Sequence, residues 1–314
     1  MSFAERLWNR AKIGTKIWLW PFTLHLRFSR SINVSKNSNR PRVQLCLSDS
    51  SLANGQVQTI RIGAKKHLTH IDESTPCVPK QSEVALIVGT GPGLGSALAR
   101  CFAKAGMAVA LAARNTKKLN GLMQEIHNQG GISRAFGCDA TDEQSVKELL
   151  SLVTKQMGVP NLVVYNVEHF IPGTLLEIET PAFEECWRAM ALGGFLVGRE
   201  AARLMVPQCS GTIIYTGATG ALRGRAEYIN MAVGKFGIRA LAQSMARDLG
   251  PLGIHVAHVI LDGGILSPRS GEAARERMTS MFPEHIAETY YQLHIQHRSV
   301  WTQELDLRPW VEKF

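Results

Sequence analysis

The stretch VALIVGTGPGLGSALARCFAKAGMAVALAAR, residues 84–114, decides the fold. It opens with an apolar run at 84–88 and passes into a glycine-rich loop. A helix is expected from residue 94 to about 105, because apolar residues recur there at spacings of three and four. Gly106 ends this helix, and residues 107–113 form a second apolar run. Strand, glycine turn, helix and strand make one βαβ unit, which places helix N-terminal amides against a phosphate group and indicates a dinucleotide.

The loop at 89–95 contains four glycines. Gly89, Gly93 and Gly95 read G-x-x-x-G-x-G, with Gly91 between them, and not the G-x-G-x-x-G of two-domain dehydrogenases. A tight turn by itself requires glycine for backbone reasons only. The flanking strands and helix nevertheless favour nucleotide binding over a purely structural turn.

This segment resembles the short-chain dehydrogenase/reductase family, whose loop usually reads T-G-x-x-x-G-x-G; Val88 stands where the family usually has threonine. The resemblance implies a Rossmann-type doubly wound parallel sheet, an NAD(P) cofactor and a homo-oligomer. The positions that would bind the cofactor at the loop and after the sixth strand are Gly89, Gly91, Gly93, Leu94, Gly95 and Gly263.

From residue 81 onward, strand and helix patterns alternate steadily, which predicts a single α/β domain, 81–314, with helices on both faces of the sheet. Thr116 is the expected cap of the second helix, and Thr141 with Gln144 forms a capping-box pattern before the third. Further helices are expected at 180–205 and 227–249. Further strands are expected at 132–137, 162–165, 211–216 and 254–261, with a seventh edge strand within 301–309.

The net charge of +9 is confined to one part of the chain of 314 residues. Residues 1–80 contain 13 Lys and Arg but four Asp and Glu, whereas residues 81–314 contain 22 of each sign. A nucleic-acid-binding protein would place a basic face on a folded module that can be recognised, and none is visible. We therefore expect no nucleic-acid partner.

The N-terminal extension, 1–80, has the composition of a targeting segment. It is basic, contains serine and alternates arginine or lysine with apolar residues, as organelle transit peptides do. A mitochondrial location is favoured over a plastid one, and a cytoplasmic location follows if the segment is not a targeting peptide. The apolar stretch 17–26 is too short for a transmembrane helix. An interfacial helix carrying Trp8, Trp18 and Trp20, or a disordered tail, are the alternatives.

The six cysteines contain no C-x-x-C pair and no zinc spacing. We expect buried free thiols, as in a reducing compartment, and no metal site.

Several polar residues follow the predicted strands directly. The carboxyl ends of parallel strands meet at one edge of the sheet, where ligands bind in doubly wound folds. These positions are Gly89, Arg114, Asp139, Asn166, Thr216 and Asp262.

Arg114 ends the second strand. An acid at this position would bind the adenosine ribose hydroxyls, whereas a guanidinium suits a 2′-phosphate, so NADP(H) is favoured over NAD(H). A solvated arginine at a strand end is the alternative. The resemblance places Asp139 beside the adenine ring, although it is equally a turn acid. Asn166 stands in YNVE, where the family usually shows NNAG.

Lys235 matches the lysine of the family's Y-x-x-x-K pair, in which the tyrosine exchanges a proton and the lysine lowers its pKa and holds the nicotinamide ribose. Four residues earlier stands Met231, whose thioether cannot donate a proton. The family's serine and asparagine map to Ala218 and Ala191. Of the four usual catalytic positions, Lys235 alone is retained.

Three hydroxyl groups are candidate replacements for the missing tyrosine. Tyr228 lies seven residues before Lys235, about 10 Å along the helix axis. Thr216 and Tyr165 end predicted strands. The sequence thus predicts an NADP(H)-dependent oxidoreductase of the short-chain type, with a non-standard proton donor and an unidentified carbonyl or alcohol substrate. The alternative is a catalytically silent NAD(P)-binding redox sensor or scaffold.

Overall fold

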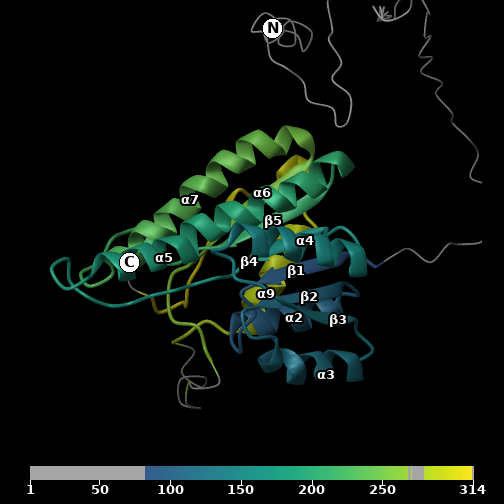
Figure 1. The fold of residues 1–314 in the computed structure, drawn as a ribbon, viewed down its shortest axis with the longest axis horizontal. Coiled ribbons are helices and arrows are strands. Elements are labelled where there is room, and N and C mark those ends of the chain that lie inside the picture. The colour runs from purple at the N-terminus through teal and green to yellow at the C-terminus, as the bar shows by residue number, and fades with distance from the viewer. Residues whose placement is uncertain (1–81, 268–269, 271–278, 313–314) are drawn as a thin grey trace, which may run out of the picture. The chain divides into compact units, whose positions relative to one another are not determined.

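A computed structural model of the chain describes residues 82–267, 270 and 279–312. Within them, seven parallel strands form one sheet in the order β3-β2-β1-β4-β5-β6-β7 (Figure 1). This is the predicted Rossmann-type doubly wound sheet, including the seventh edge strand. The strands are β1 (Val84–Val88), β2 (Ala108–Ala113), β3 (Ser133–Gly137), β4 (Leu162–Tyr165), β5 (Gly211–Thr216), β6 (Ile254–Leu261) and β7 (Glu304–Leu307).

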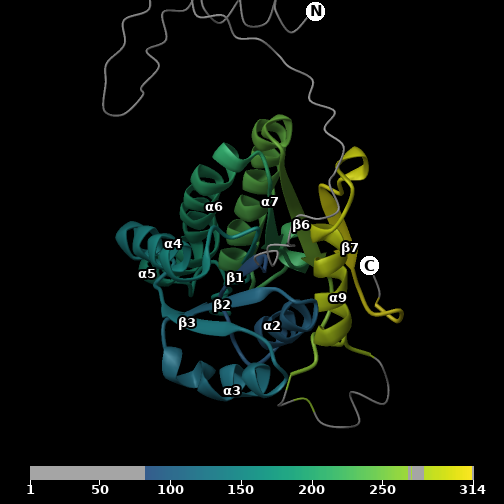
Figure 2. The same ribbon diagram turned by 90° about the vertical axis from the view of Figure 1, so that its right-hand side faces the viewer.

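Helices cover both faces of this sheet (Figure 2). One face carries α2 (Leu94–Lys104), α3 (Asn120–Asn128) and α9 (Pro283–His294), whose apolar residues share one core cluster. The opposite face carries α4 (Glu143–Met157), α6 (Gly193–Met205) and α7 (Ile229–Leu249); α5 (Thr180–Trp187) leads into α6 and contacts α7.

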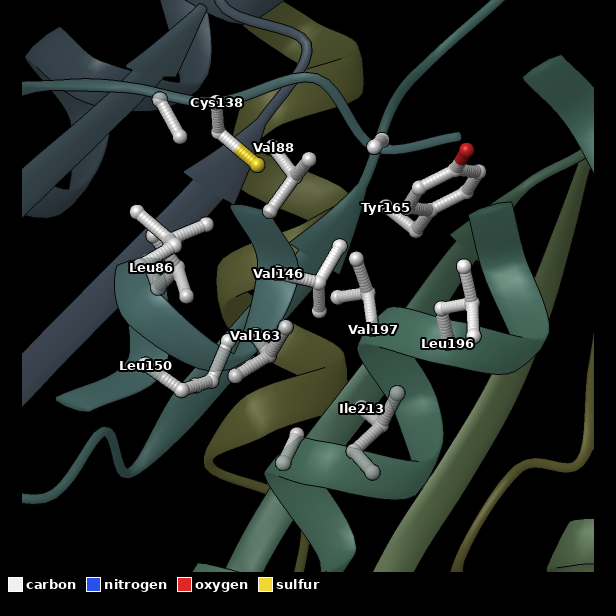
Figure 3. Packing of buried hydrophobic residues seen from close by; sticks show 14 of the residues in the cluster. Leu86, Val88, Cys138, Val146, Leu150, Val163, Tyr165, Leu196, Val197 and Ile213 are labelled. Atoms are coloured by element: carbon white, nitrogen blue, oxygen red, sulfur yellow. The ribbon is translucent and has the colours of Figure 1, made fainter. Parts of the chain in front are cut away.

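The central strands are apolar on both sides because both sides are covered. Successive residues of β1 point to opposite faces: Leu86 joins one core cluster and Ile87 the other, and both are fully buried. Figure 3 shows the first cluster, where Val146 and Leu150 of α4 lie over β1 and β4. This packing explains why short apolar runs in the sequence are sufficient to locate the strands.

The local ends of two helices differ from the prediction. Asn115, not Thr116, accepts the capping hydrogen bond before a short 3-10 turn (Thr116–Leu119) that leads into α3. Asp142, not Thr141, caps α4 through the amide of Ser145. The expected helix 180–205 is helical throughout, but a π-helical turn (Arg188–Leu192) separates α5 from α6.

The strand order determines where a ligand can bind. The chain moves from β1 outward to β3 and then returns across β1 to β4, so the connections after β1 and β4 leave the sheet in opposite directions. A crevice opens at such a switch point, outside the carboxyl ends of the strands. The glycine loop, residues 89–95, and the loop that follows β4 border this crevice.

The basic extension 1–80, with its targeting and interfacial-helix hypotheses, lies outside the described residues and stays a prediction. No helix among the residues that the structure describes is long and apolar enough to cross a membrane. Four cysteines lie in this part of the chain and all are free thiols. Cys138 and Cys186 are buried as predicted, Cys101 is half-buried, and Cys209 is exposed, contrary to the prediction.

Candidate functional site

Gly89 shows why the loop after β1 needs glycine at its first position. Its φ is +92°, and a Cβ atom there would lie 2.6 Å from the backbone oxygen of Asn166. Asn166 in turn donates a side-chain hydrogen bond to the Gly89 carbonyl, with a length of 3.1 Å. The loops after β1 and β4 therefore cross with backbone against backbone, a close approach that only glycine allows.

The remaining glycines of the loop differ in what surrounds them. A Cβ at Gly95 would lie 2.9 Å from the Cα of Thr90, so α2 packs directly against the loop. By contrast, a Cβ at Gly91 or Gly93 would meet no atom within 4 Å. The side chain of Leu94 is buried in the core, so this residue can offer a ligand its amide only.

Helix α2 starts at the loop without a side-chain cap from any described residue, and no acidic residue stands in its first turn. The first-turn amides of a helix otherwise lack partners and favour an anion. Open space at Gly91 and Gly93, uncapped amides and a close-packed Gly95 together fit a phosphate group. The residues present thus fit the pyrophosphate of a dinucleotide.

A cleft of about 920 Å³ runs from this loop along the carboxyl ends of the neighbouring strands. Three exposed residues after β2 line it: Arg114, Asn115 and Lys118. Arg114 makes no hydrogen bond or ion pair with another described residue, so its guanidinium is available to a ligand. Lys118 was missed by the sequence reasoning, although it lies four residues after Arg114, in the 3-10 turn, and adds a second positive charge.

Asp139 also lines the cleft, at the end of β3. One carboxylate oxygen accepts hydrogen bonds of 2.9 and 2.8 Å from the amide and hydroxyl of Thr141. These bonds, and after them the charge of Arg114, lower the pKa of Asp139. Asp139 is thus a turn acid whose residue also lines the cleft, and its place beside an adenine ring stays a prediction.

Lys235 lies on α7 and is fully buried. Its ammonium donates a 3.2 Å hydrogen bond to the backbone carbonyl of Thr216 and lies 3.5 Å from a carboxylate oxygen of Glu168. Burial lowers the pKa of Lys235, and the charge of Glu168 opposes this effect. Glu168 lines the cleft two residues after Asn166, so Lys235 is linked to the cleft through it.

Glu168 is the residue that sequence reasoning missed at this end of the site. The signal was present, since Glu168 follows the carboxyl end of β4 within the YNVE segment. An ion pair between residues 168 and 235 depends on the loop's path, however, and no local pattern indicates it.

The three candidate hydroxyls lie in different surroundings. The buried Tyr165 hydroxyl donates to the carbonyl of Ala189, and burial raises its pKa well above the ordinary value. The buried Thr216 hydroxyl is 3.0 Å from that of Tyr290. Tyr228 is half-buried, its ring stacked on Phe170. Both Tyr165 and Thr216 are thus engaged with other protein groups, and the proton-donor roles of the three hydroxyls stay predictions.

Gly263 does not reach the cleft either. Its φ is +150°, and a Cβ there would lie 2.5 Å from Cδ of Pro309, so the segment after β7 accounts for the glycine. The preceding Asp262 is fully buried and accepts a 2.6 Å hydrogen bond from Thr219. The predicted cofactor contact at Gly263 therefore has no support from the geometry.

Comparison with known proteins agrees with this architecture. Residues 83–277 match the family model described as short chain dehydrogenase. Sorbitol-6-phosphate 2-dehydrogenase of Escherichia coli (strain K12) is 32% identical over 190 residues, which cover 60% of this chain and 73% of that protein. The human 3-oxoacyl-[acyl-carrier-protein] reductase is 25% identical over 201 residues, or 64% of this chain and 83% of that protein.

Solved structures give the same result. A short-chain dehydrogenase from Rhodopseudomonas palustris is 35% identical, with a TM-score of 0.65 over 74% of this chain and 100% of that one. A metagenomic short-chain oxidoreductase solved in complex with NADP shares the fold at 23% identity, with a TM-score of 0.64 over 74% of this chain and 99% of that one. The chain therefore belongs to the short-chain dehydrogenase/reductase family, a family of oxidoreductases that use nicotinamide cofactors.

Proposed function

We propose that the protein is an NADP(H)-dependent oxidoreductase that interconverts a carbonyl compound and an alcohol. The observation that carries the cofactor choice is Arg114, exposed, without a described partner and in the lining of the cleft. A guanidinium pairs with a phosphate through two hydrogen bonds, and Lys118 adds a second cation beside it. An acidic residue, which would favour the ribose hydroxyls of NAD(H), is absent from positions 114–118.

Different residues along the cleft would bind different parts of the cofactor and the substrate. The glycine loop and the start of α2 would hold the pyrophosphate, and Arg114 the 2′-phosphate. Asn166 and Gly89 fix the two loops on either side of the crossing. The bound cofactor supplies the hydride. Lys235, which is linked to the cleft through Glu168, is the retained family residue that would hold a ribose hydroxyl or a substrate oxygen and carry the proton.

The cofactor preference is tested by measuring the affinity of the full-length protein for NADPH and NADH from nucleotide fluorescence. We expect tighter binding of NADPH. Arg114→Ala should weaken NADPH binding by about 10- to 100-fold, since a charge-assisted contact contributes roughly 1.5–3 kcal/mol, and should leave NADH nearly unchanged. Lys117→Ala, a neighbouring cation outside the cleft lining, is the matched control. Equal affinity of the wild type for both cofactors would refute the proposal.

A catalytically silent NAD(P)-binding protein is the second candidate, favoured by Met231 and Ala218 at the positions of the family's tyrosine and serine. A screen of carbonyl compounds with NADPH, followed at 340 nm or by mass spectrometry, separates the two. Turnover that is lost in Lys235→Met identifies an enzyme. Saturable NADPH binding without turnover of any compound would favour the sensor or scaffold.

We also propose that the protein is a homo-oligomer, on the basis of its family. Light scattering coupled to size-exclusion chromatography measures the mass in solution. A monomer at micromolar concentration would contradict this proposal and would leave the cofactor proposal unaffected.

A further inference from the structure

Lys235 is held by two protein groups that differ in kind. An ammonium group has three N–H donors. One reaches the Thr216 carbonyl at 3.2 Å and a second faces the Glu168 carboxylate at 3.5 Å. The third donor has no hydrogen-bond partner among the described residues. Among the described residues, Glu168 is the one acidic group that forms an ion pair with Lys235.

The burial of Lys235 makes this carboxylate important. An ammonium ion that is removed from water is disfavoured relative to the neutral amine, unless an opposite charge lies close by. The structure shows both effects on the pKa of Lys235: burial lowers it and Glu168 raises it. His258 on β6 is close enough to Lys235 for the lysine charge to lower the pKa of the imidazole. Its Nδ1 is 3.1 Å from a carboxylate oxygen of Glu304. Arg239, bound to the same Glu304, is the next cation on α7.

Glu168 differs from Lys235 in its access to solvent. The Glu168 side chain is 52% exposed and lines the cleft, whereas the Lys235 side chain is 1% exposed. A proton that leaves Lys235 therefore has a short route to water along the carboxylate. The family's tyrosine position offers no such route here, because Met231 has no exchangeable proton.

We propose that Glu168, which lines the cleft, is a positioning residue that holds the buried Lys235 as an ammonium ion and connects it to solvent protons. This inference rests on the proposed oxidoreductase function. In carbonyl reduction the carbon gains a hydride from the reduced nicotinamide cofactor and the oxygen gains a proton. As the new O–H bond forms, an N–H bond of Lys235 breaks and its electron pair stays on nitrogen. The amine then takes a proton by way of Glu168 from water.

The test is the titration of Lys235 in the full-length protein without cofactor. Selective ¹³C labelling at lysine Cε gives one NMR signal per lysine, and Lys235→Arg assigns the signal. Glu168→Gln keeps the size of the side chain and removes its charge. We expect it to lower the titration midpoint of Lys235 by about one pH unit or more, which is tenfold in the ratio of ammonium to amine. Glu168→Asp should restore part of the difference.

Glu184→Gln is the matched control, because Glu184 lines the same cleft but pairs with Arg188. It should leave the Lys235 midpoint unchanged. An equal midpoint in wild type and Glu168→Gln would overturn the inference. If Glu168→Gln fails to fold, Glu168→Asp tests the same pair by itself: the shorter side chain moves the carboxylate away from the ammonium and should lower the midpoint, and a midpoint equal to that of the wild type overturns the inference. These titrations are made without cofactor and need no turnover. The proposed function is tested separately by NADPH binding, so the two proposals can fail independently.

Where turnover is found, the same variant gives a second readout. Reduction needs protonated Lys235, so the rate falls as the pH rises through its titration midpoint. Glu168→Gln should therefore move the alkaline limb of the kcat profile to lower pH. A proportional loss of rate at every pH, with the limb unmoved, would contradict the inference.

Discussion

The glycine loop at 89–95 and the lysine site formed by Lys235, Thr216 and Glu168 are held together by different kinds of contact. The loop is built by backbone: Gly89 crosses the Asn166 backbone at van der Waals limits, and α2 starts against it. At the lysine site, the side chain of Lys235 on α7 reaches the Thr216 backbone carbonyl at the end of β5 and the Glu168 side chain in the loop after β4. A close contact between two backbones allows few residue types at the crossing. A site that depends on side chains can instead exchange one residue at a time during evolution.

This difference explains how the chain retains the glycine loop that would bind the cofactor while the residues around the lysine site depart from the family pattern. Met231, Ala218 and Ala191 stand where the resemblance implies tyrosine, serine and asparagine. The sheet and α7 are complete with these side chains in place. Lys235 nevertheless keeps a backbone acceptor and a carboxylate partner. The two regions should therefore respond differently to mutation and to pH.

The largest effect is expected from Gly89→Ala. Its Cβ would meet the Asn166 carbonyl at 2.6 Å with φ at +92°, so strain and collision should lower the free energy of unfolding by about 2–3 kcal/mol. Urea denaturation measures this loss. NADPH binding should fall as well, because the crossing of the two loops opens.

Gly91→Ala is the control that separates folding from binding. Its Cβ would enter open space, so the stability should change by about 1 kcal/mol or less. NADPH affinity should nevertheless drop at least tenfold if the cofactor lies where the cleft indicates. A Gly89→Ala protein as stable as wild type would contradict the role assigned to the backbone crossing.

A smaller effect on the free energy of unfolding is expected from a change of pH. It should act on β6 and its neighbours, the part of the sheet that includes the lysine site. Burial lowers the pKa of His255 and His258, both on β6, and of His294 on α9. Their contribution to stability is complete above the ordinary pKa of 6.5 and is lost as the pH falls below it, because the unfolded chain then binds more protons. Each histidine contributes at most about 1.4 kcal/mol per pH unit.

Urea denaturation at pH 7.5 and 5.5 measures this loss of stability. His255→Phe keeps a ring against Trp301 and removes one titrating group, so its stability should change less between the two values. Hydrogen exchange at pH 5.5 should increase first in β6 and its neighbours, because the glycine loop contains no histidine. Uniform loosening of the whole domain would contradict a regional difference.

The sheet was predictable from the sequence because its strands are buried on both faces. Such strands appear as short apolar runs, and residues 84–88, 162–165 and 254–261 match β1, β4 and β6 at both ends. The positions of Arg114 and Asp139 at the cleft followed as well, since parallel strands end at one edge. Even the seventh strand was located, although only within a wider segment.

Side-chain partnerships were not predictable, because they depend on segments far apart in the sequence. Glu168 and Lys235 are 67 positions apart in the chain. Tyr165 ends a strand as expected, but its hydroxyl turns toward the Ala189 carbonyl and not toward the cleft. The predicted helix caps were wrong by one position only. Asn115 directly precedes Thr116 and Asp142 directly follows Thr141, and each is an equally suitable hydrogen-bond acceptor.

The smallest effects should come from the two tyrosines near this edge. Tyr165→Phe removes the donor of a buried carbonyl, so we expect a loss of about 1–2 kcal/mol in stability and no change in cofactor affinity. Tyr228→Phe keeps the ring that stacks on Phe170 at 4.6 Å between centroids, so stability should stay within about 0.5 kcal/mol. Because the Tyr228 hydroxyl lies two helical turns from Lys235, turnover should also change little. A fall in kcat of about 100-fold or more in Tyr228→Phe, without a loss of NADPH affinity, would identify Tyr228 as the proton donor in place of Lys235.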